Sequence, residues 1–131
     1  YIKNRQKFVQ INNKKLPISS HHAILKSNLP TVADAHQEDK EKFLACLENL
    51  KEKNFIIIDT PGSDTFLSQL SHSYADTLIT PLNDSFIDLD MLARINNETR
   101  EISGPSTYAE MVWDQKKQKL LRDRTQFDWI V

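Results

Sequence analysis

The residues of this sequence best suited to chemistry follow the apolar run FIII, which begins at Phe55. The run ends in Asp59, and Thr60 and Pro61 separate that aspartate from Gly62. In phosphoryl-transfer sites of the P-loop class, an aspartate at the end of an apolar strand helps to hold Mg²⁺. A glycine shortly after it lets the backbone approach a phosphate closely, because glycine has no side chain. This order of residues predicts the metal-holding half of a nucleotide site.

The other half of such a site is a glycine-rich phosphate loop, and the sequence offers none. It contains two glycines, Gly62 and Gly104. The Asn-Lys-x-Asp motif that reads guanine is also absent, which disfavours a GTPase-like switch protein. The four histidines do not show the spacing of a zinc site.

A second polar segment, TPLNDS, follows the apolar stretch of residues 75–81 and contains Asn83 and Asp84. In open parallel α/β sheets, ligands bind beyond the carboxyl ends of the strands. We therefore expect Asn83 and Asp84 to lie at the same edge of a sheet as Asp59.

The elements that would position these residues alternate between helix and strand. Helices are predicted for residues 1–13, 37–54, 107–124 and the stretches that follow the capping residues 63–65 and 83–85. Strands are predicted for residues 55–59, 75–81, 128–131 and a short segment at 21–25, with a loop or extended excursion over 96–106. This order predicts an α/β fold with a mostly parallel sheet flanked by helices. Because residues 55–58 are all apolar, we expect that strand to be buried on both faces.

Composition indicates a soluble domain. The chain has 131 residues, of which 39% are hydrophobic and 27% charged, and its net charge is −1. No apolar run approaches the roughly 20 residues that span a bilayer, and the basic, polar N-terminus shows no secretory signal. The single cysteine, Cys46, fits a reducing cytoplasm.

The helix predicted for residues 107–124 is basic in its second half. Basic clusters can meet the phosphates of nucleic acid, although a solvated helix face is the more common explanation of such a cluster. The cluster consists of Lys116, Lys117, Lys119, Arg122 and Arg124.

Two long segments make a family resemblance recognisable. FIIIDTPGSDTFLSQLSHSYADTLITPLNDSFIDLDML (55–92) and PSTYAEMVWDQKKQKLLRDRTQFDWIV (105–131) resemble the MipZ family of division-plane positioning ATPases. That family belongs to the ParA/MinD group of deviant Walker-motif ATPases. A fainter similarity runs through NRQKFVQINNKKLP (4–17), so the resemblance covers nearly the whole chain.

The resemblance implies a P-loop NTPase fold, ATP and Mg²⁺ as ligands, and an ATP-dependent homodimer. It also implies a ParB-like partner, nucleoid DNA and a bacterial cytoplasmic location. Asp59 would be the Walker B-like aspartate that holds Mg²⁺ through water, and Gly62 the γ-phosphate glycine of the second switch. Thr60 and Pro61 would shape that turn. The remaining implied residues are Asn83 and Asp84, near the nucleotide and the dimer face, and the five basic residues of the 107–124 helix as DNA contacts.

The family's phosphate-loop lysine is expected before residue 1, and its adenine-reading asparagine after residue 131. Residues 1–131 would then be the central part of a single ATPase domain, and we expect the chain alone neither to bind ATP tightly nor to hydrolyse it. Half of a split ATPase and a catalytically dead remnant that serves as a protein-interaction module are the alternatives. Without the central phosphate-loop strand, apolar surface would be exposed. The chain should then be unstable or aggregation-prone unless a partner completes it.

Overall fold

The computed structural model describes residues 2–12, 19–61, 64–83, 86–96 and 98–131. They fall into two compact units, Tyr1–Lys51 and Glu52–Val131. None of the helices among these residues is both long enough and apolar enough to cross a membrane.

The first unit contains two helices, α1 (Ile2–Asn12) and α2 (Val32–Leu50). Helix α2 begins earlier than predicted because Thr31 caps it: the Thr31 hydroxyl accepts a hydrogen bond from the Asp34 amide at 3.1 Å. The strand predicted for residues 21–25 is wrong, since no partner strand pairs with it among the described residues. The irregular segment is instead tied to α2 by the Ser27 amide, which donates to the buried Asp39 carboxylate at 2.6 Å.

The second unit carries the alternating pattern of an α/β fold. Its elements are α3 (Phe66–Tyr74), β1 (Thr77–Ile79), α4 (Phe86–Leu89), β2 (Ala93–Ile95), β3 (Ile102–Pro105), α5 (Thr107–Asp123) and β4 (Asp128–Ile130). Strands β1 and β4 pair in parallel, and β2 and β3 form an antiparallel hairpin where a loop or extended excursion was expected. The predicted α/β class, with its mostly parallel main sheet, is confirmed.

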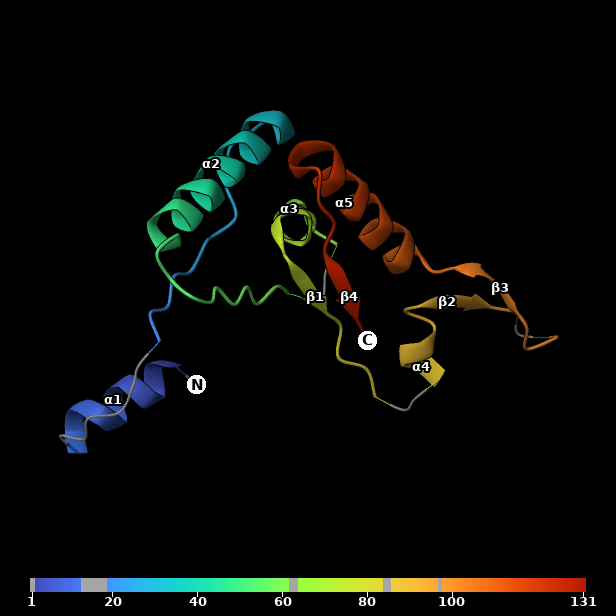
Figure 1. Ribbon diagram of the computed structural model, residues 1–131, viewed down its shortest axis with the longest axis horizontal. Coiled ribbons are helices and arrows are strands. Elements are labelled where there is room, and N and C mark those ends of the chain that lie inside the picture. The colour runs from blue at the N-terminus through green and yellow to red at the C-terminus, as the bar shows by residue number, and fades with distance from the viewer. Residues whose placement is uncertain (1, 13–18, 62–63, 84–85, 97) are drawn as a thin grey trace. The chain divides into compact units, whose positions relative to one another are not determined.

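Helices α3 and α5 pack against each other and supply much of the core of this unit (Figure 1). Thr65 caps α3 and Ser106 caps α5, each through a side-chain oxygen that accepts an amide of the first turn. Val112 of α5 and Phe127, which precedes β4, are fully buried. The buried residues of α3 are small or polar, namely Ser68, Ser71, His72 and Ser73.

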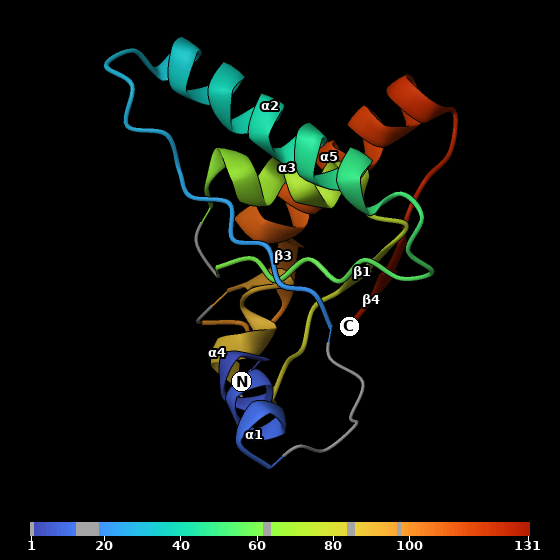
Figure 2. The same ribbon diagram turned by 90° about the vertical axis from the view of Figure 1, so that its left-hand side faces the viewer.

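The prediction of a buried strand at residues 55–58 is wrong. These residues cross Figure 2 as a line without an arrow, and the exposed fractions of Phe55 and Ile57 are 89% and 93%. A strand buried on both faces needs neighbours on both edges. Among the described residues, β1 pairs only with β4, and residues 55–58 pair with nothing. Without a hydrogen-bonded ladder, the apolar side chains stay in water.

His72 is buried in α3, 6% exposed, and its Nδ1 atom finds no hydrogen-bond partner in the described part of the chain. Burial lowers the pKa of His72, because the charged imidazolium loses its hydration, although the Ser68 backbone and the Asp64 carboxylate act in the opposite direction. Its ring meets the ring of Tyr108 edge-on, with centroids 6.3 Å apart. The burial of this side chain against α5 therefore favours the neutral form of His72.

We predict that the free energy of unfolding falls as the pH drops below about 6.5, the pKa of an unperturbed histidine. The native pKa of His72 is lowered, so between that value and the unfolded one the unfolded state binds more protons than the native state. The contribution of neutral His72 to the free energy of unfolding is fully present above the pKa of the unfolded state. It is lost as the pH falls from that value toward the lower native pKa. Urea unfolding at about pH 7.5 and pH 5.5 measures the loss.

The matched variants are His72→Gln, which removes the titrating group, and His21→Gln, which changes an exposed histidine. The first should flatten the pH dependence, and the second should leave it unchanged. An equal slope in both variants would contradict the assignment. The pKa values of Glu38 and Asp123 are lowered by hydrogen bonds from Ser27 and Arg122, so their effect lies at more acidic pH.

Candidate functional site

The first turn of α3 anchors the segment that contains Asp59. The Thr65 hydroxyl accepts the Ser68 amide at 3.2 Å and lies 3.0 Å from the Ser68 hydroxyl. The same Ser68 hydroxyl lies 3.5 Å from the carbonyl oxygen of Pro61. Asp59 and Pro61 are exposed and Thr60 is half-buried, so this carboxylate faces solvent at the foot of α3. Gly62, the predicted phosphate-facing glycine, lies outside the described residues.

The end of β1 is fixed by Thr80, which is 6% exposed. Its hydroxyl accepts a hydrogen bond from the indole Nε1 of Trp129 at 3.0 Å and lies 2.9 Å from the hydroxyl of Tyr108. Its amide donates to the carbonyl oxygen of Ile130 at 2.9 Å. One side chain thereby joins β1, α5 and β4 immediately before the loop that carries Asn83.

Sequence reasoning missed this role of Thr80. The available signal was a lone hydroxyl residue between an apolar strand and Pro81, with Tyr108 and Trp129 able to supply partners. Buried hydroxyl and indole groups generally find hydrogen-bond partners, so such a threonine indicates a polar contact with a distant element.

Asn83 is exposed, and its backbone amide donates to a carboxylate oxygen of Asp88 in α4 at 2.9 Å. This bond holds the C-terminal end of the loop to α4, and the Thr80 contacts hold its N-terminal end next to β1. Asp84 lies outside the described residues. No hydrogen bond or ion pair joins Asp59 to Asn83 among the residues that the structure describes.

Asp59 is suited to hold the metal of a nucleotide site, because its carboxylate is exposed and makes no ion pair within the described ranges. Carboxylate oxygens are ligands for Mg²⁺, which keeps several of its waters. The phosphate half is not found there. In the described residues, no lysine or arginine is bonded to the segment Asp59–Pro61 or to Asn83.

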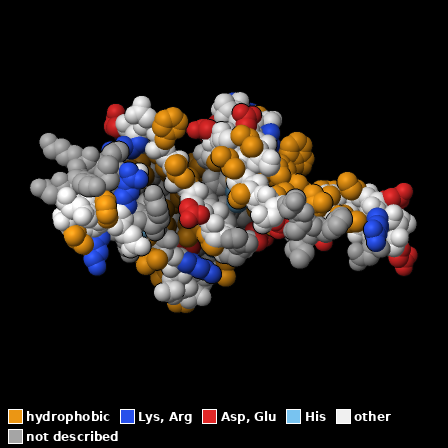
Figure 3. Space-filling model, turned by 90° about the horizontal axis from the view of Figure 1, so that it is seen from below, with side chains coloured by type: hydrophobic (Ala, Val, Ile, Leu, Met, Phe, Trp, Pro, Cys, Tyr) orange, Lys and Arg blue, Asp and Glu red, His pale blue; other side chains and the backbone are white. Residues whose placement is uncertain are grey.

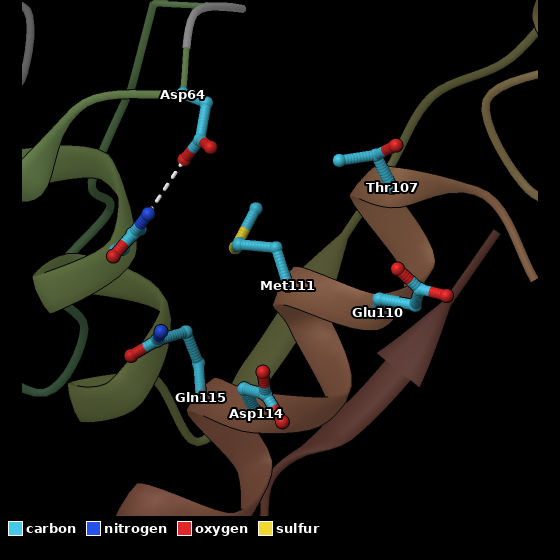
Figure 4. A pocket seen from close by; sticks show the side chains of 7 residues that line it. Asp64, Thr107, Glu110, Met111, Asp114 and Gln115 are labelled. Carbon is cyan, nitrogen blue, oxygen red and sulfur yellow. Dashed lines mark hydrogen bonds between the residues drawn. The ribbon is translucent and has the colours of Figure 1, made fainter.

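A separate open pocket of about 240 Å³ lies between the start of α3 and the first turns of α5 (Figure 4). Its lining consists of Asp64, Gln69, Thr107, Glu110, Met111, Asp114 and Gln115. Three of these are carboxylates, which would repel a triphosphate. Asp64 accepts a hydrogen bond from Gln69 at 2.7 Å, Glu110 pairs with Arg94, and Asp114 pairs with Lys117 at 3.0 Å. The pocket therefore does not fit the predicted nucleotide.

The five basic residues predicted to contact DNA have different surroundings. Lys119 is 4% exposed, and its Nζ atom lies 3.0 Å from a carboxylate oxygen of Asp76. The guanidinium of Arg122 stacks over the ring of Tyr74, 3.6 Å from its centroid, and donates to the carbonyl oxygen of Ser73 at 2.7 Å. These contacts hold α5 to α3 and to Asp76, the residue before β1, so both cations are already engaged within the protein.

The other three are not bonded to α3 or to Asp76 among the described residues. Lys117 is exposed and pairs with Asp114, and Arg124 is exposed at the C-terminal cap of α5. Lys116 is half-buried, and its Nζ atom lies 5.8 Å from the ring centroids of both Trp113 and Phe127. Lys116, Lys117 and Arg124 thus remain candidates for contact with DNA.

Comparison with known families decides the class of the protein. The model of the family described as ATPase MipZ matches residues 1–131, the whole chain. The chain belongs to the ATPase MipZ family. This membership gives the α/β fold its P-loop class and places the chain among the ParA-like ATPases. A search of curated proteins finds no match.

We predict that the Asp76–Lys119 pair stabilises the second unit although Asp76 itself is exposed. In the variant Asp76→Asn, the buried ammonium of Lys119 keeps only the Asp123 carboxylate at 3.9 Å. The free energy of unfolding should fall by about 1–3 kcal/mol, since a buried charge then lacks its closest partner. Denaturant unfolding measures this loss.

The control is Asp114→Asn, which breaks the pair with Lys117 in which both side chains are well exposed. That change should cost at most about 0.5 kcal/mol. Equal losses in the two variants would show that Lys119 is not a buried, partner-dependent charge.

Proposed function

We propose that this chain contributes the second-switch half of an ATPase that positions the division site and partitions chromosomes. The family match over residues 1–131 is the observation that carries the proposal. An exposed carboxylate, Asp59, at the foot of a capped helix supports it. The working site would be the bacterial cytoplasm at the nucleoid, with a ParB-like partner and an ATP-dependent homodimer.

In this proposal, Asp59 holds Mg²⁺ through water, and Thr60 and Pro61 set the direction of the turn. Gly62 brings a backbone amide to the terminal phosphate. Asn83 and Asp84 face the nucleotide and the dimer partner from the neighbouring loop, which Thr80 and Asp88 anchor at its two ends.

The phosphates need an additional element. Gly62 and Gly104 are the two glycines in the sequence, so these residues cannot form a glycine-rich cradle by themselves. We propose that a lysine-containing phosphate loop is supplied by further residues of the same polypeptide or by a separate subunit.

For DNA, we propose Lys116, Lys117 and Arg124 as phosphate contacts. Lys119 and Arg122 would act indirectly, by keeping α5 in place against Asp76 and Ser73. This division follows from the burial of the Lys119 ammonium, which cannot reach a phosphate backbone, and from the contacts of the Arg122 guanidinium with Tyr74 and Ser73.

A second candidate function is a protein-interaction module without catalysis. The observation that favours it is the exposure of the apolar residues 55–58, from 39% for Ile58 to 93% for Ile57. Exposed, contiguous apolar surface is typical of interaction sites.

Calorimetry with MgATP tests the first proposal. The 131-residue chain alone should bind ATP weakly or not at all. Addition of a polypeptide that supplies a Lys-Gly-Gly-x-x-x-Lys-Thr loop and its strand should restore binding. Asp59→Asn should then weaken the Mg²⁺-dependent part of the affinity, whereas Asp128→Asn, at the opposite end of β4 from the site, should not.

Tight binding or turnover of ATP by the chain alone would overturn the claim that the phosphate half comes from elsewhere. Equal affinities for the Asp59→Asn and Asp128→Asn complexes would overturn the metal role of Asp59.

A further inference from the structure

His72 is a buried titratable residue that the proposed ATPase site does not use. Charged side chains reach the surface on the face drawn in Figure 3, whereas His72 is 6% exposed. Its Nδ1 atom has no hydrogen-bond partner among the described residues. An imidazolium has two N–H donors, so a protonated His72 would hold a charged donor at Nδ1 without an acceptor. A buried charge of this kind is costly, which favours movement of the ring once it is charged.

The groups that favour the charged form of His72 already have other partners. The Ser68 carbonyl oxygen accepts a hydrogen bond from the Ser71 hydroxyl at 2.8 Å. The Asp64 carboxylate, whose charge attracts an imidazolium, accepts one from Gln69 at 2.7 Å. Burial acts against both groups and is the largest cause of the lowered pKa of His72.

Helix α5 meets His72 with a ring and not with a charge. The ring in contact with His72 is that of Tyr108. The charged groups of α5 that lie toward α3 each have another partner among the described residues: Glu110 pairs with Arg94, Asp114 with Lys117, Lys119 with Asp76, and Arg122 donates to Ser73. A proton on His72 is therefore not compensated from this side.

Tyr108 connects His72 to the end of β1. Its ring meets the ring of His72 at 6.3 Å with an angle of 77° between the planes, and the ring of Trp129 at 6.2 Å with an angle of 68°. Its hydroxyl lies 2.9 Å from the hydroxyl of Thr80, which also accepts the Trp129 indole at 3.0 Å. Movement of the His72 ring removes one of these two ring contacts of Tyr108. The surroundings of Thr80, directly before the loop that carries Asn83, then change as well.

We propose that His72 is a pH-sensitive switch that couples α3 to the end of β1. The neutral ring keeps Tyr108 in contact with Thr80 and Trp129. Uptake of a proton from water moves the ring away from Tyr108 and opens this contact, while the helices remain folded. The switch needs no nucleotide, so it stands independently of the proposed ATPase function. It is also distinct from the loss of stability predicted above, because it acts within the folded chain.

The fluorescence of Trp129 tests this proposal. The variant Trp113→Phe leaves Trp129 as the single tryptophan of the chain. As the pH falls from about 8 to about 5.5, we expect the emission to shift to longer wavelength with a midpoint below about 6.5, because the indole gains contact with water. The far-UV circular dichroism should stay constant over the same range. In this background, His72→Gln should remove the shift, and His21→Gln, which changes an exposed histidine, should keep it.

A second variant keeps the His72 ring and changes only the charge that attracts its proton. Asp64→Asn should move the midpoint to lower pH, because the ionised imidazole loses a favourable carboxylate. Asp114→Asn, which changes a carboxylate paired with Lys117, should leave the midpoint in place. Each of four results would overturn the proposal: an emission that does not change with pH, an equal shift in His72→Gln, an unchanged midpoint in Asp64→Asn, or a loss of helical signal together with the shift.

Discussion

The hydroxyl group of Thr80 is the contact on which the arrangement of the second unit depends. It lies within hydrogen-bond distance of Tyr108 in α5 and Trp129 in β4, at 2.9 and 3.0 Å, and Thr80 directly follows β1. The rings of Tyr108 and Trp129 also meet edge-on, with centroids 6.2 Å apart. Elements distant in sequence are thereby joined at one buried point. The β1–β4 sheet has few backbone hydrogen bonds because its strands are short. The side-chain bonds of Thr80 therefore add to the connection between β1, α5 and β4.

The position of this contact explains how the fold serves the site. The loop that carries Asn83 leaves β1 directly after Thr80, and α4 holds it again through Asp88. The turn that carries Asp59 is held separately, through Ser68 and Thr65 at the start of α3. Helices α3 and α5 pack against each other, so both polar segments depend on the same pair of helices. The chain belongs to a family of ATPases, so the two polar segments are the part of the fold to examine for contact with ATP.

Local signals in the sequence predicted those elements that are stabilised locally. The capping residue Thr65 and the apolar stripe behind it indicated α3, and the long periodic stretch after residue 106 indicated α5. The strand prediction for residues 55–58 was wrong because an apolar run forms a buried strand only where neighbouring strands pair with it. That pairing depends on the whole sheet and not on the run itself. Lys119 was predicted to be an accessible DNA contact, and only the packing of α5 shows that this lysine is buried beside Asp76. Within the candidate site, Asp59 and Asn83 were identifiable from motif order, whereas Thr80 was not, because its partners lie in other elements.

Thr80→Val tests the central contact most directly. Valine keeps the shape of threonine but leaves the Trp129 indole and the Tyr108 hydroxyl without their shared oxygen, whereas Thr80→Ser keeps that oxygen. We expect denaturant unfolding to show a loss of about 1–3 kcal/mol for Thr80→Val relative to Thr80→Ser, the cost of part-buried polar groups left unpaired. A Thr80→Val variant as stable as Thr80→Ser would show that the hydroxyl does not hold β1, α5 and β4 together.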